Sequence, residues 1–378
     1  MENEVFDIAI VGGGLAGLGL SIQLGRMGHT VLLLEKEEYP FHKVCGEYIS
    51  LESWDFLSGL GIDLPGLHVS GIKKLQVSSP HGTLMEQALP LGGFGISRYL
   101  LDNTMAALAR NAGVIIKENA KVTDVHFGED EFIVEESQYS YRARVACGSY
   151  GKRSNLDIKW KRSFTTTARN KLNNYVGVKY HVKCDFPADT IALHTFSGGY
   201  CGVVRIEDDK YCLCYLTTAA NLQKSGGDIL KMEESILSAN PHLEKIFAGS
   251  QRLYDAPLAI SQISFESKSQ VEDHVLMIGD AAGMITPLCG NGMSMALHGS
   301  KIAAENIRRF LEGNCSRAEM ESGYAGAWRK AFEKRLAMGR RIQRLFGNAY
   351  LTGMLVRSSK IFPFIVRWLI RQTHGQPF

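Results

Sequence analysis

A length of 378 residues favours two domains, or one large discontinuous domain, over a single small one. Hydrophobic residues make up 45% of the chain and charged residues 21%, a balance that is typical of globular proteins and excludes a disordered or fibrous chain. No apolar run approaches the roughly 20 residues that cross a bilayer. The acidic start over residues 1–4 is unlike a signal or transit peptide. These features predict a cytoplasmic protein.

Charge is unevenly distributed along the chain. The formal net charge is +3, yet residues 334–378 hold nine Lys or Arg and no Asp or Glu, which leaves −6 for residues 1–333. A basic segment of this kind is typical of contact with a membrane surface or a nucleic acid.

The eight cysteines are scattered, with no Cys-x-x-Cys pair and no Cys/His cluster at zinc-ligand spacing, so the sequence predicts no metal site. Cys212 and Cys214 lie two apart in an apolar run. In a strand they would share one face, which indicates buried thiols.

The N-terminal elements form one compact unit. Residues 7–11 are an apolar strand that ends at Gly12, a helical stretch follows, and residues 30–35 form a second buried strand. Strand, Gly-rich turn, helix and strand within about 30 residues have the size of a βαβ unit.

The rest of the chain changes character twice. Residues 98–113 have helical periodicity and lead into a strand at 114–116. Between 115 and 270 strand patterns dominate, interrupted by one helix near 227–238. A buried strand at 275–278 then precedes a long helix over 291–311, and the remainder is predicted as helix. Nucleotide-type segments thus flank a strand-rich middle.

The first chemical motif is the Gly-x-Gly-x-x-Gly stretch Gly12–Gly17, in which Leu15 and Ala16 separate the last two glycines. Gly12 permits the tight turn, Gly14 permits the approach of a pyrophosphate, and Gly17 permits close packing of helix on strand. The helix N-terminus offers amide donors to phosphates. Glu35, 18 residues past Gly17 at the end of the next strand, is placed to accept hydrogen bonds from both ribose hydroxyls.

The second motif follows the strand at 275–278. Gly279-Asp280 is succeeded by the loop Pro287–Met293, which contains Gly290, Asn291 and Gly292 and leads into a helix. With the first motif, this pattern resembles the flavoprotein hydroxylase superfamily of the para-hydroxybenzoate hydroxylase fold. The resemblance implies that Asp280 holds the ribityl chain of FAD and that the loop packs along the flavin. Amides at the following helix N-terminus would face the negative charge of the reduced ring.

Two further segments agree with this resemblance. Arg98, in Arg98-x-x-Leu101-Asp102, resembles the family arginine near the FAD pyrophosphate or ribityl group. Lys43-x-Cys45-Gly46 resembles the segment that lies over the flavin in the geranylgeranyl reductase branch. Cys45 belongs to no Cys-x-x-x-x-Cys pair, so we expect no second thiol and no disulfide-reductase mechanism. The resemblance also assigns Lys36 and Val122 to the cofactor site.

The implied architecture is α/β with an inserted α+β part. We expect a discontinuous Rossmann-like FAD-binding domain over residues 1–75, 95–160 and 270–312, a β-rich substrate domain over 76–94 and 161–269, and a helical C-terminal segment over 313–378.

The sequence departs from the family in three places. Tyr150 occupies the position of the Asp in the family's Asp-Gly pair, which leaves the electron donor open. The stretch Tyr200–Arg205 lacks the Trp and Pro of the reductase motif Tyr-x-Trp-x-Phe-Pro. The four tryptophans stand alone, whereas halogenases carry Trp-x-Trp, which argues against halogenation.

We therefore expect an FAD-dependent oxidoreductase, in first place a monooxygenase that hydroxylates or epoxidises an apolar, aromatic or lipid-like small molecule. The flavin performs such chemistry itself, so no catalytic side chain is assigned, with Cys45 the one candidate near it. No second Gly-x-Gly-x-x-Gly is present, so we expect no separate nicotinamide-binding domain. The expected electron donor, NAD(P)H, would therefore bind transiently. The alternatives are a geranylgeranyl reductase-like double-bond reductase and a flavin-binding protein without turnover.

The C-terminal segment carries two apolar stretches, residues 351–356 and 361–370, interleaved with Arg357, Lys360, Arg367 and Arg371. Such a pattern is typical of an interfacial helix, and equally of helices that cover a core. Coverage of a core is the first interpretation, and peripheral contact with the inner face of a membrane is the alternative. Nucleic-acid binding is not expected, because no nucleic-acid-binding fold accompanies the charge. Oligomeric state stays open.

Overall fold

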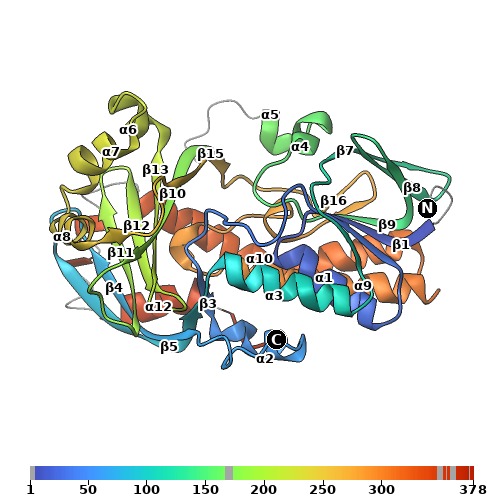
Figure 1. Cartoon of the computed structure of the whole chain (residues 1–378), viewed down its shortest axis with the longest axis horizontal. Helices are drawn as coiled ribbons and strands as arrows, with labels where there is room; N and C mark the ends of the chain where they lie inside the picture. The colour runs from blue at the N-terminus through green and yellow to red at the C-terminus, as the bar shows by residue number, and fades with distance from the viewer. Residues whose placement is uncertain (1–4, 167–172, 347–351, 355, 358–362, 374) are drawn as a thin grey trace.

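The computed structural model describes residues 5–166, 173–346, 352–354, 356–357, 363–373 and 375–378. Two β-sheets lie at opposite ends of an elongated molecule, with long helices running along it (Figure 1). This architecture confirms the predicted α/β class with its inserted strand-rich part.

The first sheet has the strand order β16-β17-β9-β1-β2-β6, with β7 and β8 extending it beside β9. Its central strands pair in parallel, and β1, β2 and β17 are almost wholly buried, as expected of strands covered on both faces. Its strands are β1 (Val5–Val11), β2 (Val31–Leu34), β6 (Ile115–Lys117), β7 (Val122–Gly128), β8 (Glu131–Glu136), β9 (Ser140–Gly148), β16 (Val271–Glu272) and β17 (Val275–Met277).

Three helices pack together beside this sheet. α1 (Leu15–Arg26) follows the Gly-rich turn and contacts both α3 (Arg98–Asn111) and α9 (Gly292–Leu311). The Ser97 side chain accepts a hydrogen bond from the Leu100 amide and so caps the start of α3. The predicted βαβ unit, the helix near 98–113 and the helix near 291–311 are all confirmed.

The second sheet has the order β14-β10-β13-β12-β11-β4-β5-β3, and β15 also pairs with β10. Its strands are β3 (Tyr48–Ser50), β4 (Ser70–Ser78), β5 (Leu84–Gly95), β10 (Asn173–Lys183), β11 (Thr190–Phe196), β12 (Gly199–Arg205), β13 (Tyr211–Thr218), β14 (Gln251–Arg252) and β15 (Leu258–Ser264). Because β3 and most of β4 precede residue 76, this sheet begins earlier in the chain than the boundary drawn from the sequence.

Between residues 115 and 270 the prediction of a single helix was wrong. The structure has α4 (Asn155–Lys159), α5 (Ser163–Thr166), α6 (Ala219–Lys224), α7 (Ile229–Met232) with a π-helical turn at Glu233–Leu237, and α8 (Pro241–Gly249). These helices are too short to show periodicity in sequence. Several begin at a side-chain cap instead, as at Ser154, Asp228 and Asn240.

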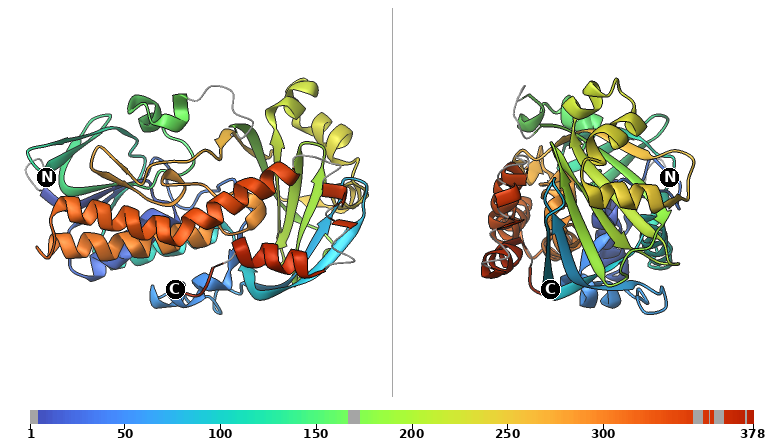
Figure 2. Two further views of the ribbon diagram at one scale, coloured as in Figure 1. Left: turned by 180° about the vertical axis from the view of Figure 1, so that it is seen from behind. Right: turned by 90° about the vertical axis from the view of Figure 1, so that its left-hand side faces the viewer.

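The C-terminal part is helical, as predicted. The long α10 (Arg317–Phe346) runs beside α9, and α12 (Pro363–Thr373) contacts both α10 and β5 (Figure 2). A further short helix, α2 (Trp54–Gly59), lies in the N-terminal third of the chain. None of the described helices combines the length and apolar character needed to cross a membrane. Leu351, Leu355, Lys360, Ile361 and Phe362 of the predicted interfacial stretches lie outside the described residues.

Candidate functional site

A large cavity is lined by residues of the second sheet and by residues that directly follow strands of the first. The space within it, counting its open mouth, is about 1270 Å³. Its lining includes the turn at 14–16, the segment 44–48, parts of residues 149–152, strands β10 to β13 and β15 of the second sheet, and residues between 278 and 296. Of the predicted site residues, Gly14, Leu15, Ala16, Cys45, Gly46, Arg98, Gly279, Asp280, Pro287, Gly290, Gly292 and Met293 lie in this lining.

The Gly-rich turn has the geometry that its motif requires. Gly12 has a φ of +103°, which L side chains rarely adopt. A side chain on Gly17 would collide with the Gly12 carbonyl oxygen, so this glycine permits the close approach of α1 to β1. A Cβ on Gly14 would instead point beside two cations, 3.6 Å from Arg98 Nη2 and 3.8 Å from Lys43 Nζ. Amide donors and cations around a bare backbone fit a diphosphate.

Asp102 fixes these two cations. Its carboxylate accepts two 2.7 Å hydrogen bonds from the Arg98 guanidinium and lies 3.0 Å from Lys43 Nζ. Although burial would raise the pKa of Asp102, the charges of Arg98 and Lys43 outweigh it and lower that pKa. Two cations against one carboxylate leave a net positive charge beside Gly14.

Glu35 closes the other side of the turn. Its buried carboxylate accepts a 2.7 Å hydrogen bond from the Gly13 amide, and the Tyr39 hydroxyl donates to the Gly13 carbonyl over 2.5 Å. Lys36 is exposed and paired with Glu37, and Val122 lies on β7 opposite Glu136. Glu35, Lys36 and Val122 are outside the described lining of the cavity, so their assignment to the adenosine half stays a prediction.

The loop from Gly279 to Met293 forms the floor of the cavity. Gly279–Ala281 make a 3₁₀ turn directly after β17, and Asp280 enters the cavity lining from it. Gly290, in the left-handed region with a φ of +67°, turns the chain into α9, whose first residues also line the cavity. Asn291 does not face the cavity lining: its side-chain amide donates over 2.5 Å to the Thr373 carbonyl at the end of α12.

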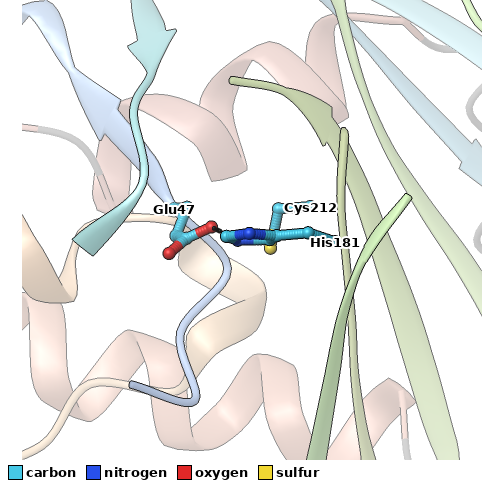
Figure 3. Close-up of side chains that lie close together, drawn as sticks. All are labelled: Glu47, His181 and Cys212. Carbon is cyan, nitrogen blue, oxygen red and sulfur yellow. Dashed lines mark hydrogen bonds and ion pairs between the residues drawn. The ribbon is translucent and has the colours of Figure 1, made fainter. Parts of the chain in front are cut away.

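A buried ion pair, not foreseen from the sequence, joins the two halves of the cavity. The Glu47 carboxylate is fully buried and pairs with Lys179 Nζ of β10. It also pairs, over 2.6 Å, with His181 Nε2 of the same strand (Figure 3). It also accepts the Arg98 amide at the start of α3 over 2.8 Å. Burial would raise the pKa of Glu47, but Lys179 and His181 outweigh it and lower that pKa to about 2.

Glu47, His181 and Cys212 offer three ligand atoms within 4.8 Å of one another, a spacing that could hold a metal ion. The Lys179 ammonium already occupies the Glu47 carboxylate, and its positive charge opposes a cation at that position. The cluster therefore fits a buried ion pair that connects the Glu47 segment to β10 better than it fits a metal centre. Little in the sequence pointed to this cluster, because its members are far apart in the chain: Glu47 and His181, which share a hydrogen bond, are 134 positions apart.

Two cysteines of β13 lie near Cys45, although neither forms a Cys-x-x-x-x-Cys pair with it. Cys212 Sγ donates to the Cys45 carbonyl over 3.3 Å, and Cys214 lines the same cavity as Cys45. Burial raises the pKa of Cys214 to about 12 and that of Cys212 well above its ordinary value, so both remain protonated thiols at neutral pH. Their placement on one face of β13 agrees with the prediction of buried thiols.

The part of the cavity formed by the second sheet is mostly apolar. Its wall includes Ile191, Leu193, Leu216 and Ile263, with the hydroxyl-bearing Tyr200 among them. Tyr200 is buried, and no described group meets its hydroxyl at normal hydrogen-bond geometry, although the Leu288 backbone comes near. The sequence had marked the Tyr200 stretch only by its difference from a family motif.

The fold and this cavity together define an FAD-binding flavoprotein. Residues 5–160 match the family model described as "FAD binding domain". This part of the chain therefore resembles an FAD-binding domain, and the proteins similar to the whole chain include geranylgeranyl reductases and flavin-dependent halogenases.

Curated relatives cover most of the chain at low identity. Conditioned medium factor receptor 1 of Dictyostelium discoideum is 26% identical over 89% of this chain and 70% of its own length. Digeranylgeranylglycerophospholipid reductase 1 of Methanothermobacter thermautotrophicus is 25% identical over 81% of this chain and 77% of its own. Among solved structures, the flavin-dependent brominase Bmp2 shares the fold, with a TM-score of 0.78, 20% identity, and coverage of 98% and 93% of the two chains.

Valine at Gly14 and at Gly17 should have opposite consequences. We expect Gly14→Val to fold normally and to lose FAD, because the new side chain meets only the flexible ends of Arg98 and Lys43 while filling the space beside them. Gly17→Val should lose about 1–3 kcal/mol of stability, since the Gly12 carbonyl must move. Thermal unfolding of the apoproteins and flavin absorbance after desalting measure both effects. Stoichiometric FAD in Gly14→Val would contradict this assignment.

Removing the Glu47 charge should weaken the junction between the sheets. We expect Glu47→Gln to cost about 3–5 kcal/mol in the free energy of unfolding at neutral pH, because Lys179 is left buried without its partner. The lowered pKa of Glu47 adds stability above its ordinary value of 4.5, and this contribution is lost as the pH falls toward 2. Glu47→Gln should therefore flatten the acid dependence of unfolding.

Denaturant titrations between neutral pH and about pH 3 measure this dependence. Glu305→Gln, on the exposed side of α9, is the matched control and should behave as the wild type. If the free energy of unfolding changes with pH equally in the wild type and in Glu47→Gln, the ion pair does not contribute to stability as proposed.

Proposed function

We propose that this protein is an FAD-dependent monooxygenase that hydroxylates or epoxidises an apolar, lipid-like small molecule. The observation that carries the proposal is the continuity of the cavity: one space is lined by the Gly-rich turn, Arg98 and Asp280 at one end and by the apolar face of the second sheet at the other. A molecule bound against that sheet would lie beside the cofactor.

The residues of the chain divide the work within this cavity. The α1 N-terminus, Arg98 and Lys43 would hold the diphosphate of FAD, and Asp280 would hold its ribityl chain. Bound FAD would supply the redox chemistry, with NAD(P)H as the transient donor. Ile191, Leu193, Leu216 and Ile263 would exclude water and orient an apolar substrate.

A second candidate is a reductase that saturates isoprenoid double bonds. It is supported by the cavity position of Val44, Cys45 and Gly46, in the segment that resembles the geranylgeranyl reductase branch, and by the relative named as a digeranylgeranylglycerophospholipid reductase. Saturation of a double bond needs a proton as well as a hydride, and Tyr200 is a buried hydroxyl in the cavity wall. A flavin-binding protein without turnover is the third candidate.

Product analysis with reduced protein separates these functions. The purified protein should be yellow and should release FAD on denaturation. After reduction by NAD(P)H or dithionite, we expect it to consume oxygen in the presence of an isoprenoid or aromatic substrate and to add one oxygen atom. A gain of two hydrogen atoms under anaerobic conditions would support the reductase instead. Incorporation of added bromide would indicate a halogenase and overturn both proposals.

We propose further that α12 brings the protein to an anionic membrane surface. Phe364 and Trp368, one helical turn apart, are 59% and 52% exposed, while Ile370 on another face of the helix packs under the second sheet. Arg357 and Arg371 are exposed in a C-terminal segment without acidic residues. Exposed aromatic side chains beside cations suit the headgroup region of a bilayer.

Vesicle co-sedimentation at low salt tests this surface. We expect the full-length protein to pellet with vesicles containing phosphatidylserine, and the double variant Phe364→Ser/Trp368→Ser to bind at least several-fold more weakly. Tyr139→Ser, which removes an equally exposed ring at 60% exposure from the far end of the molecule, is the control and should bind as the wild type. Wild-type protein that stays in the supernatant would contradict the proposal.

A further inference from the structure

Three side chains, of which Lys268 and Arg162 are buried, hold three consecutive carbonyl groups of the turn that carries Asp280. Lys268 Nζ donates to the Asp280 carbonyl over 2.8 Å, Arg162 Nη2 to that of Ala281 over 3.0 Å, and Gln270 Nε2 to that of Ala282 over 3.2 Å. None of these side chains belongs to the predicted cofactor motifs. Together they fix the backbone of the turn from outside the cavity.

Tyr150 anchors this arrangement. Arg162 is 1% exposed, donates over 2.8 Å to Asp157, and donates over 3.2 Å to the Tyr150 hydroxyl. Tyr150 in turn donates to the same Asp157 oxygen over 2.8 Å. The residue that replaces the family's Asp thus acts through a buried arginine on the Gly279–Ala282 turn.

Lys268 also joins the two walls of the cofactor half of the cavity. Besides Asp280, its ammonium donates to the Lys152 carbonyl over 3.1 Å, and it lies 4.5 Å from the centre of the Phe164 ring. Lys152 and Gly151 line the cavity opposite Asp280. Lys268 is therefore a positive charge directly behind the residues that enclose the cofactor.

We propose that Lys268, Arg162, Gln270 and Tyr150 form a latch that shapes the Asp280 turn for FAD, and that the charge of Lys268 makes retention of FAD dependent on pH. The peptide C=O and N–H point in opposite directions, so holding the three carbonyls also fixes the direction of the amides that follow them. An ordered turn needs no reorganisation when FAD binds, which lowers the cost of binding. These four residues are positioning residues.

The sign of the pH dependence follows from the surroundings of Lys268. Burial lowers its pKa to about 8, the carboxylates of Asp157 and Asp280 oppose this shift, and the Arg162 charge adds to it. FAD brings two negative phosphates, which favour the protonated lysine. Binding of FAD therefore takes up a proton above about pH 8, and affinity falls as the pH rises, by at most about tenfold per pH unit.

Titration of apoprotein with FAD from about pH 6 to about pH 10, followed by quenching of flavin fluorescence, tests the latch without any substrate. We expect the Kd of the wild type to rise about three- to tenfold above pH 8. Lys268→Arg keeps the charge throughout and should give a flat profile at near wild-type affinity. Lys268→Met should give a flat profile at weaker affinity.

Two further variants distinguish the latch from loss of folding. Tyr150→Phe leaves the Arg162–Asp157 pair in place and should raise Kd two- to fivefold with an unchanged pH profile. Lys330→Met, which removes an exposed charge on α10, should match the wild type. The inference is overturned if Lys268→Arg keeps the wild-type pH dependence or if Lys268→Met binds FAD as the wild type does. It rests on FAD as the cofactor, so wild-type protein without FAD affinity would instead refute the proposed function.

Discussion

The ion pair between Glu47 and Lys179 is the constraint on which the cavity depends. It joins the segment 43–47 to β10 of the second sheet, and the Arg98 amide on the same carboxylate joins both to the start of α3. Burying two charges is costly, and a well-packed apolar pair would often be as stable. An apolar contact is not directional, however, whereas this carboxylate accepts from three groups on two elements at defined positions. The pair therefore fixes how the two sheets meet, and with it the width of the cavity between them.

The C-terminal helices complete the enclosure from the opposite side. Arg335 of α10 reaches the buried Glu52, Thr286 donates to the Gly339 carbonyl, and Asn291 donates to Thr373 at the end of α12. These contacts hold the 279–293 loop between α10 and α12. A segment whose composition favours a membrane surface thus also forms part of the core. The two roles are compatible because α12 buries Ile370 and Thr373 on one side and exposes Phe364 and Trp368 on another.

Local patterns predicted the cofactor half of the fold well. Spacing relative to a strand or helix identified the Gly-rich turn, Glu35, Arg98 and Gly279-Asp280 in the sequence. Most of these residues line one cavity in the structure. Contacts between distant segments were not predictable in this way. Glu47 and His181, or Lys268 and Asp280, carry no local signal, because their pairing depends on strand register and on how the sheets pack. The short helices α4 to α8 were missed for a related reason: they are defined by caps and turns and not by a repeating apolar face.

The same division between local and distant contacts explains how the chain departs from its family without losing the site. The usual Asp beside the cofactor is replaced by Tyr150, whose ring is too large to reproduce a carboxylate contact. Its hydroxyl instead holds Asp157 and Arg162, and the guanidinium supports the Ala281 carbonyl. The proposed latch thus uses several side chains that shape the backbone where the resembling motif has a single Asp. A motif comparison sees only the loss of the Asp, since its substitutes come from residues 157, 162 and 268–270, which become neighbours only in the folded chain.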